Sequence, residues 1–427
     1  MQPIRGWMSA RFRWMAAEPP TDARTVVHRA LDRLAGDCPA LGIALSGGGD
    51  STALMHLAHD WATPRGVVLR AVTVDHGLRP ESGAEARAAG DAAAALGIAH
   101  QVLRWDGPAS GNLMAQARAA RMALIADWAM GHGIAAVALG HTRDDQAETV
   151  LMRLMRGAGV DGLSGMAATR RASGVLWLRP MLDVSRDALR AELRARNAGW
   201  IDDPSNDNAD FDRVRVRQAI AALGLDAGAL ARTAGDLRSA RAALDHAARD
   251  TARGFSTDRG SLTLPLSPLL DAPSEIRRRL VAAALRWVNG ADYPPRRDPL
   301  AHLLEEIGRG RKATLDGVIV RPGAGALRLI REPAAARRAP PSQDGRAWDR
   351  RWRVTGLPPG AAVCALPPDM LARFDWRASG LSLDEAASTP GVRLPSGRWL
   401  APVLSPGEGC TAAPLRADRA FVSLLSH

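Results

Sequence analysis

The strongest chemical signal in the sequence is the string SGGGDS at residues 46–51. It directly follows an apolar run at 43–45 that predicts a strand, and it directly precedes a stretch with helical spacing. Glycines let a backbone approach phosphate groups closely, and the first turn of a helix offers N–H groups without intrahelical partners. The string therefore predicts a phosphate-binding turn, although a glycine-rich turn can also be purely structural. It is neither a Walker loop, which needs a lysine, nor a GxGxxG turn.

Two carboxylates, Asp145 and Glu148, form the second signal. They lie three residues apart in the string GHTRDDQAET at 140–149, in the predicted first turn of a helix, so both project from one face. A fixed pair of carboxylates is a natural receptor for a cation such as an ammonium group. The same pair could instead only complement the helix dipole.

Other polar and basic residues follow predicted strand ends and helix starts. Asp75 and His76 stand where the apolar strand predicted at 67–75 stops. Arg118 and Arg121 share one face of a predicted helix, where they could approach phosphates or simply face solvent. Three further arginines, at 213, 215 and 217, follow a polar turn and suit contacts to RNA phosphates, with a solvated loop as the alternative.

The elements that must position these residues alternate between short apolar runs and helical patterns from about residue 41 to 156. This βαβα series predicts an α/β, doubly wound N-terminal domain whose parallel sheet is covered by helices on both faces. Right-handed crossovers place the active site of such a domain at the carboxyl ends of the strands. Every signal up to Glu148 falls at such a strand end or at the helix start after it.

The rest of the chain predicts further parts. We expect a disordered extension at 1–21, the α/β domain at 22–216, a helical tRNA-binding or substrate-binding domain at 217–332, a linker at 333–345 and a small β-containing module at 346–427. A true initiator at Met8 or Met15 would explain the extension equally well.

Composition limits the classes of function. The net charge of +11 is carried almost entirely by arginine, which suits a polyanionic partner such as nucleic acid, although a coding sequence rich in G and C gives the same bias. Three cysteines, Cys38, Cys364 and Cys410, lie far apart without a CxxC pair, which argues against a zinc ribbon, an iron–sulfur cluster or a disulfide framework. We therefore expect a reducing, cytoplasmic setting. No apolar run is long enough to span a bilayer.

Taken as a whole string, SGGGDS resembles the pyrophosphate-binding PP-loop of the N-type ATP pyrophosphatases. The strings VDHGLR at 74–79, ARAAR at 117–121, GHTRDDQAET at 140–149 and FDRVRVR at 211–217 are similar to those of tRNA(Ile)-lysidine synthases in particular. The resemblance covers residues 22 to about 220 well. Three positions depart from the family pattern: Met122 replaces a tyrosine, Thr142 a histidine and Val214 an asparagine.

The resemblance implies that ATP and Mg²⁺ take part and assigns roles to the residues above. ATP binding falls to Ser46, Gly47, Gly48, Gly49, Asp50, Ser51, Asp75 and His76. Asp50 would also hold the metal, and the catalytic residues would be Asp50, Arg118 and Arg121. Free lysine would bind at Asp145 and Glu148, and tRNA at Arg213, Arg215 and Arg217.

The activity so implied is ATP-dependent ligation of lysine to C2 of the wobble cytidine in the isoleucine tRNA with a CAU anticodon, through an adenylated cytidine. Three alternatives stay open. A PP-loop tRNA thiolase would need a cysteine pair or cluster ligands, and a PP-loop amidotransferase would need a glutaminase. The third is a tRNA-binding protein that retains the fold without turnover.

Overall fold

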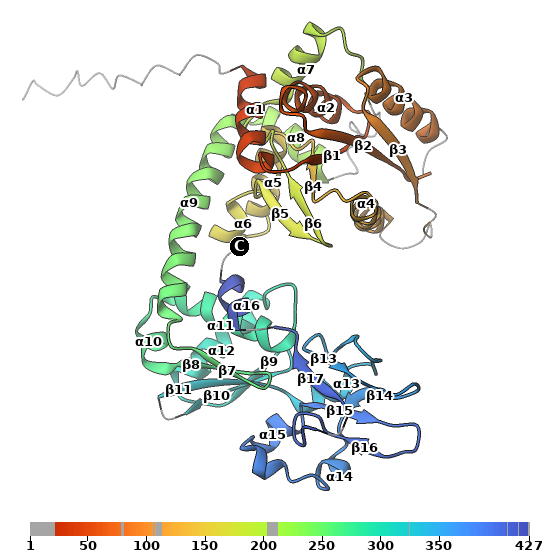
Figure 1. Ribbon diagram of the computed structural model, residues 1–427. Helices are drawn as coiled ribbons and strands as arrows, with labels where there is room; N and C mark the ends of the chain where they lie inside the picture. The colour runs from red at the N-terminus through yellow and green to blue at the C-terminus, as the bar shows by residue number, and fades with distance from the viewer. Residues whose placement is uncertain are drawn as a thin grey trace, which may run out of the picture. The chain divides into compact units, whose positions relative to one another are not determined.

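The computed structural model describes residues 22–77, 81–105, 107, 113–202, 212–323, 325–407, 409–416 and 418–425 (Figure 1). The predicted extension at 1–21, part of the VDHGLR string and the polar turn before residue 212 lie outside these residues. The chain divides into two compact units, Met1–Ser239 and Ala240–His427.

A six-stranded sheet forms the centre of the first unit, within the described residues. Its strands are β1 (Ala40–Ala44), β2 (Val68–Asp75), β3 (Ala99–Arg104), β4 (Ala136–Leu139), β5 (Thr169–Ala172) and β6 (Val175–Leu178). They lie in the order β3-β2-β1-β4-β6-β5, all parallel except the terminal β5, which runs antiparallel to β6.

Helices cover both faces of this sheet. The helical elements described in this unit are α1 (Ala23–Ala35), α2 (Gly49–Ala62), η1 (Thr63–Arg65), α3 (Ser82–Ala95), α4 (Leu113–Gly131), α5 (Arg143–Leu154), α6 (Val160–Leu163), α7 (Arg186–Ala195) and α8 (Asp212–Ala222). Side chains alternate along the short strand β4: Ala136 and Ala138 join the core under α1, α2, α3 and α7, while Val137 and Leu139 join the core under α4. Figure 1 shows α4 on the face opposite α2.

The strand order reverses at β1. The chain places β2 and then β3 on one side of β1 and returns to place β4 on the other. Ligands of open α/β sheets bind beyond the carboxyl ends of the strands at such a switch point. The segments that follow β1 and β4 are the SGGGDS and GHTRDDQAET strings, so the topology places both at the same edge of the sheet, beside its switch point.

The second unit contains a five-stranded antiparallel sheet in the order β7-β8-β11-β10-β9. Its strands are β7 (Ser256–Asp258), β8 (Ser261–Pro265), β9 (Ala313–Leu315), β10 (Val318–Gly323) and β11 (Ala326–Arg331). The helices α10 (Leu266–Asp271), α11 (Ser274–Asn289), α12 (Arg297–Gly308) and α16 (Asp418–Leu424) accompany it. One hydrophobic core joins this sheet to α11, α12 and Phe421 of α16.

Two small sheets complete the second unit. One contains β12 (Ala347–Trp348), β13 (Trp352–Thr355) and β17 (Thr411–Pro414), and the other β14 (Ala362–Ala365), β15 (Pro390–Arg393) and β16 (Trp399–Leu400). The helical elements among them are α13 (Pro333–Arg338), α14 (Pro368–Leu371), η3 (Trp376–Ser379) and α15 (Leu383–Ala386). No helix of the described residues is long and apolar enough to cross a membrane.

The predicted fold class is confirmed: an α/β domain with a parallel sheet is followed by helical and small-sheet regions. The region predicted as helical, 217–332, also holds β7 to β11, whose lengths of three to six residues are too short for a clear alternating pattern. The segment 333–345, predicted as a linker, begins with α13. The two compact units divide at Ser239, inside α9 (Ala227–Thr251).

Candidate active site

The glycine-rich turn joins β1 to α2 in the predicted way. Gly47 has a φ of +81°, which side-chain-bearing residues rarely adopt, and a Cβ there would lie 2.7 Å from Cδ1 of Ile201. The Ile201 N–H donates to the Gly47 carbonyl at 2.9 Å, so a distant segment braces the turn. Glycine is therefore required at position 47 by both backbone angle and space.

Hydroxyl groups fix the shape of this turn. The Ser46 N–H donates to Ser51 Oγ at 3.1 Å, and Ser51 Oγ donates to the Gly48 carbonyl at 3.0 Å. Thr52 Oγ1 donates to the Gly47 carbonyl at 3.2 Å. These bonds hold the turn against the first turn of α2, whose N–H groups and dipole favour an anion.

Three carboxylates, Asp50, Asp145 and Glu148, meet one guanidinium; we call them the carboxylate cluster. Nε of Arg186 lies 3.1 Å from Asp50 Oδ2, its Nη2 3.4 Å from Asp145 Oδ1 and its Nη1 3.7 Å from Glu148 Oε1. Arg217 adds a second contact, from its Nε to Glu148 Oε1 at 2.9 Å. The structure thus brings the predicted metal ligand and the predicted lysine pair together around a residue that the sequence did not single out.

A helix cap orients Asp145. The Thr142 N–H and hydroxyl both donate to Asp145 Oδ2, at 2.8 and 2.9 Å, while the Asp145 N–H donates back to Thr142 Oγ1. This capping box leaves only Oδ1 of Asp145 directed at Arg186. The threonine that departs from the family pattern therefore has a role of its own at the start of α5.

One carboxylate oxygen of Glu148 has no hydrogen-bond partner among the described residues. Its side chain is buried, and no donor among the described residues reaches its Oε2. Burial raises the pKa of Glu148, and the neighbouring Asp145 raises it further, against the lowering effect of Arg217 and Arg186. Burial also opposes the ionisation of Asp145, but Arg186 and the Thr142 N–H outweigh it and lower its pKa. A buried acceptor without a partner is costly, so this oxygen marks a place for a cationic or donor ligand.

A different set of cations has no carboxylate partner. Arg118 and Arg121 of α4, Arg179 after β6 and Arg213 of α8 form what we call the arginine group. None of them lies within ion-pair distance of a carboxylate among the described residues. Burial lowers the pKa of Arg118, Arg121 and Arg179, that of Arg179 to about 10, and repulsion from neighbouring arginines, Arg170 among them, lowers each further. Asp145 partly opposes the shift of Arg118. Such a group needs an anion from outside the chain.

Asp75 and His76 lie at the carboxyl end of β2, as predicted. Hydrogen bonds from Ser82 and from the Gly77 N–H lower the pKa of Asp75. The His76 ring meets Trp105 edge to face, with ring centroids 5.8 Å apart, and its buried Nδ1 has no partner among the described residues. Trp105 was missed because a tryptophan at a strand end carries no motif by itself. The two rings offer an apolar surface suited to a nucleobase.

The predicted tRNA arginines separate in the structure. Arg213 joins the arginine group, Arg215 is exposed and pairs with Asp212, and Arg217 is taken up by Glu148. The other two departures from the family pattern serve packing: Met122 packs against the core under α4, and Val214 is buried. Of the three predicted tRNA arginines, Arg217 is thus the one that contacts the carboxylate cluster, through Glu148.

Arg186 is the main functional residue that sequence reasoning missed. It is the first residue of α7, where its backbone N–H donates to Asp144 Oδ2 at 2.8 Å. A cation in the first turn of a helix is opposed by the helix dipole, so its position needs nearby carboxylates. That mismatch between residue and position was the available signal.

The cysteines lie away from this crevice. Cys38 precedes β1, so it stands at the amino end of the parallel strands, and burial raises the pKa of its thiol. Cys364 and Cys410 belong to the second unit. A thiol that is hard to ionise and lies at the opposite edge of the sheet is a poor candidate for sulfur transfer.

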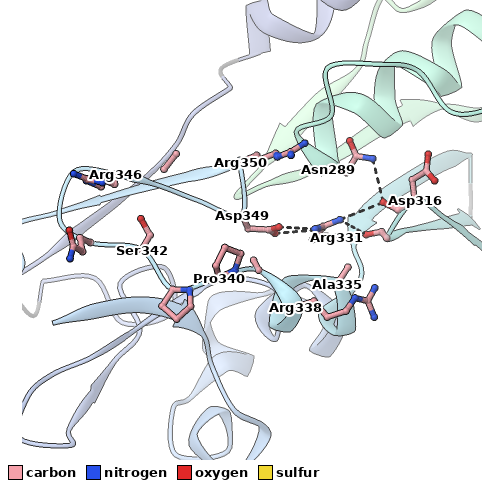
Figure 2. Close-up of a pocket in the computed structure, with 15 residues that line it drawn as sticks. Asn289, Asp316, Arg331, Ala335, Arg338, Pro340, Ser342, Arg346, Asp349 and Arg350 are labelled. Atoms are coloured by element: carbon pink, nitrogen blue, oxygen red, sulfur yellow. Dashed lines mark hydrogen bonds and ion pairs between the residues drawn. The ribbon is translucent and has the colours of Figure 1, made fainter. Parts of the chain in front are cut away.

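A cavity of about 850 Å³ in the second unit contains none of the predicted site residues. Figure 2 shows Arg331 directed at Asp349, and the two form a double contact at 2.7 and 3.0 Å. Arg351 also donates to Asp349, at 2.8 Å, so the buried charge of Asp349 is already matched. This wall of the cavity is an ion-paired structural junction.

Comparison with known proteins defines the class and then the family. A model of the PP-loop domain matches residues 23–223, so the chain carries an ATP-binding PP-loop domain. The tRNA(Ile)-lysidine synthase of Ruegeria pomeroyi is 42% identical, over 91% of this chain and 94% of that protein. The one from Hyphomonas neptunium is 41% identical, over 67% of this chain and 79% of that protein. This chain belongs to the tRNA(Ile)-lysidine synthase family.

Among solved structures, a U34-tRNA thiolase, NcsA, from Methanococcus maripaludis is similar over 52% of this chain and 78% of that chain, with 18% identity and a TM-score of 0.45.

Proposed function

We propose that this protein ligates free L-lysine to C2 of the wobble cytidine, position 34, of the isoleucine tRNA with a CAU anticodon. ATP is consumed to AMP and pyrophosphate. The observation that carries the proposal is Oε2 of Glu148, a buried acceptor without a donor among the described residues. Glu148 shares Arg186 with Asp50 of the PP-loop through its other oxygen, Oε1. The guanidinium of Arg186 thus contacts both the proposed ammonium receptor, at Glu148, and the ATP-binding turn, at Asp50.

The residues present suit ATP and Mg²⁺. The turn at 46–51 and the start of α2 would hold phosphates, with Arg118 and Arg121 opposite, and His76 and Trp105 would receive the base. No group of three or more potential metal ligands is found among the described residues, so a metal would come with the nucleotide phosphates. Magnesium is commonly held in this way, by one or two carboxylates and substrate phosphates, and Asp50 is the carboxylate available. The ion would supply charge neutralisation at the phosphates.

The reaction then has two steps. The cytosine O2 attacks the α-phosphorus of ATP and pyrophosphate leaves; the lysine ε-amine, having lost its proton, next attacks C2 and AMP leaves. Asp145 and Glu148 would bind an ammonium group of lysine and orient the molecule. The arginine group would stabilise the negative charge of the phosphates.

The target base must leave its stack to reach this crevice, which is easiest in a single-stranded anticodon loop. We propose that Arg213 and Arg215 contact the phosphates of that loop. Arg217, offered for the same role, is held by Glu148 in this structure, so its contribution would act through the lysine site. Three free, widely spaced cysteines are consistent with work in the cytoplasm.

The test is incorporation of labelled lysine into a CAU-anticodon isoleucine tRNA transcript with ATP and Mg²⁺, with AMP and pyrophosphate measured alongside. Lysine-dependent labelling with equal amounts of AMP is the expected result. Release of AMP and pyrophosphate without labelling would point to another nucleophile such as sulfur, and release of neither would point to a tRNA-binding protein without turnover.

A further inference from the structure

Among the described residues, Arg186 is the side chain that contacts both the PP-loop carboxylate and the two carboxylates of α5. Each nitrogen of its guanidinium serves a different acid: Nε Asp50, Nη2 Asp145 and Nη1 Glu148. Its side chain is only 17% exposed, so the three contacts form largely out of water. One side chain thus neutralises acids from two strand ends, β1 and β4.

The backbone around Arg186 is fixed from two directions. Ser185 Oγ caps α7 by accepting the Ala188 N–H at 3.3 Å, and Asp144 accepts the N–H of Arg186 itself. The Arg143 N–H donates to the Val184 carbonyl at 2.9 Å, which ties the start of α5 to the approach to α7. The guanidinium is therefore placed relative to α5 by hydrogen bonds that do not depend on its own charge.

The contacts leave one oxygen of Glu148 without a donor and engage both oxygens of Asp145. Oε1 of Glu148 receives Arg186 and Arg217, whereas Oε2 receives no donor among the described residues. Oδ2 of Asp145 is held by Thr142, and among the described residues its Oδ1 has only the contact to Arg186 at 3.4 Å. Oε2 of Glu148 is buried, so an ammonium would have to enter beside it. There it would meet an acceptor without a donor and share Oδ1 of Asp145, while Oε1 of Glu148 kept Arg186 and Arg217.

We propose that Arg186 is a positioning residue for lysine: it fixes Asp145 and Glu148 in the orientation that presents Oδ1 of Asp145 and the unpartnered Oε2 of Glu148, and it ties them to Asp50 of the PP-loop. The inference rests on the proposed lysine ligation. Without the guanidinium, three acids that face a common point would repel one another and turn apart. Lysine affinity would then fall although Arg186 itself holds no substrate.

The experiment compares Arg186→Ala and Arg186→Lys with Arg196→Ala in the full chain. Arg196 is a matched control, because it follows α7 directly, is 20% exposed and contacts two acids, Asp60 at 2.7 Å and Glu192 at 2.6 Å. Steady-state labelling gives kcat and KM for lysine and for ATP, and thermal unfolding reports stability. Arg186→Gln replaces the alanine variant should that fail to fold.

We expect Arg186→Ala to raise the KM for lysine by about tenfold or more, the effect of losing a charge-assisted contact, and the KM for ATP by a smaller factor. Arg186→Lys should recover part of the lysine affinity, because an ammonium keeps the charge but not the three-way fork. Arg196→Ala should lower the melting temperature and leave the KM for lysine unchanged.

Two results would overturn the inference while leaving the proposed function standing. One is an unchanged KM for lysine together with a lower kcat in Arg186→Ala that the Arg186→Lys variant does not restore. That result would mean a general structural role for Arg186. The other is a lower KM for lysine, which would mean that Arg186 competes with the substrate. A wild-type protein that incorporates no lysine would instead remove the proposed function, and the inference with it.

Discussion

The carboxylate cluster and the arginine group lie in the same unit and differ in how their charges are matched. Every acid of the carboxylate cluster has an arginine within 4 Å, either Arg186 or both Arg186 and Arg217. The arginine group, in contrast, has no carboxylate at ion-pair distance among the described residues, and burial and mutual repulsion lower the pKa of three of its four members.

The difference indicates what each region receives. A neutralised cluster with one buried oxygen that has no donor, on Glu148, suits a single small cation. In the arginine group Arg118 is exposed and the other three arginines are half-buried. Unmatched cations that are close together repel one another until an anion arrives, and both ATP and tRNA are polyanions. The junction at Asp349 in the second unit shows the third possibility, since its two arginines leave it fully paired. Incomplete charge matching therefore separates these two candidate binding regions from the structural junction at Asp349.

The largest effect should come from Asp50→Ala, which removes the one acid that belongs to both the PP-loop and the carboxylate cluster. We expect pyrophosphate release to fall by at least about 100-fold, as when one electrostatic contact to a transition state is lost. Asp60→Ala is the control, because Asp60 lies at the far end of the same helix and also contacts two arginines. Retention of more than a tenth of wild-type release in Asp50→Ala would remove Asp50 from the chemistry.

Glu148→Gln tests whether the carboxylate cluster binds a cation, because it removes the charge of this side chain and leaves its volume nearly unchanged. The KM for lysine should rise by about 10- to 100-fold, since a hydrogen bond to a charged group contributes about 1.5–3 kcal/mol. Pyrophosphate release without lysine should stay within about threefold of wild type, the range of a contact that does not take part in the first step. Steady-state kinetics in which lysine dependence is unchanged would contradict the assignment of Glu148.

The anion side is tested by Arg118→Ala and Arg179→Ala. Each variant should weaken the affinity for tRNA or for ATP by roughly tenfold. Where the lost contact is to a tRNA phosphate, the slope of log tRNA affinity against log salt concentration should become shallower by about 1. Arg65→Ala is the control, because Arg65 pairs with Asp32 at 2.8 Å and follows α2 at the amino edge of the sheet. Unaltered tRNA and ATP affinities in both variants would show that the unmatched arginines serve neither polyanion.

The pH dependence of lysine binding should also distinguish the two sides. Burial raises the pKa of Glu148, whereas the pKa of Asp145 is lowered, so Glu148 is the first of the pair to be protonated as pH falls. Protonated Glu148 attracts an ammonium weakly, so the KM for lysine should rise by a few-fold between about pH 7 and pH 5, above the usual glutamate pKa of about 4.3. Glu148→Gln should lack this acid limb, and an identical limb in that variant would assign the titration elsewhere.

Much of the first unit could be predicted from sequence, because its strands and helices alternate regularly and its motifs sit at strand ends. The second unit was less accessible, since strands such as β7 and β9 have only three residues and give no periodicity. The positions of Gly47, Asp75 and Asp145 followed from local pattern. Arg186 did not, because its role depends on packing between α7 and α5, more than 30 residues apart in the chain.

The fate of the three arginines near residue 215 shows the same limit. Spacing placed Arg213, Arg215 and Arg217 on one segment, but only the fold decides that one joins unpaired cations, one meets Asp212 and one meets Glu148. Thr142 is the opposite case. The family pattern has a histidine at this position, so the resemblance assigned no role to the threonine. A threonine three residues before an acid at the start of a helix is nevertheless a capping signal, and it could have been used.

The smallest effect should come from Thr142→Ala, which removes the cap that holds Asp145. Loss of an N-cap hydroxyl should lower the free energy of unfolding by about 1 kcal/mol. The KM for lysine should rise by only a few-fold, because Asp145 keeps the backbone N–H of residue 142 as a donor at 2.8 Å. Chemical denaturation and steady-state kinetics measure the two effects, and Thr142→Ser, which retains the hydroxyl, should restore most of both. If the alanine variant lost stability but kept the wild-type KM for lysine, the orientation of Asp145 would not depend on its cap, and Arg186 would hold that carboxylate alone.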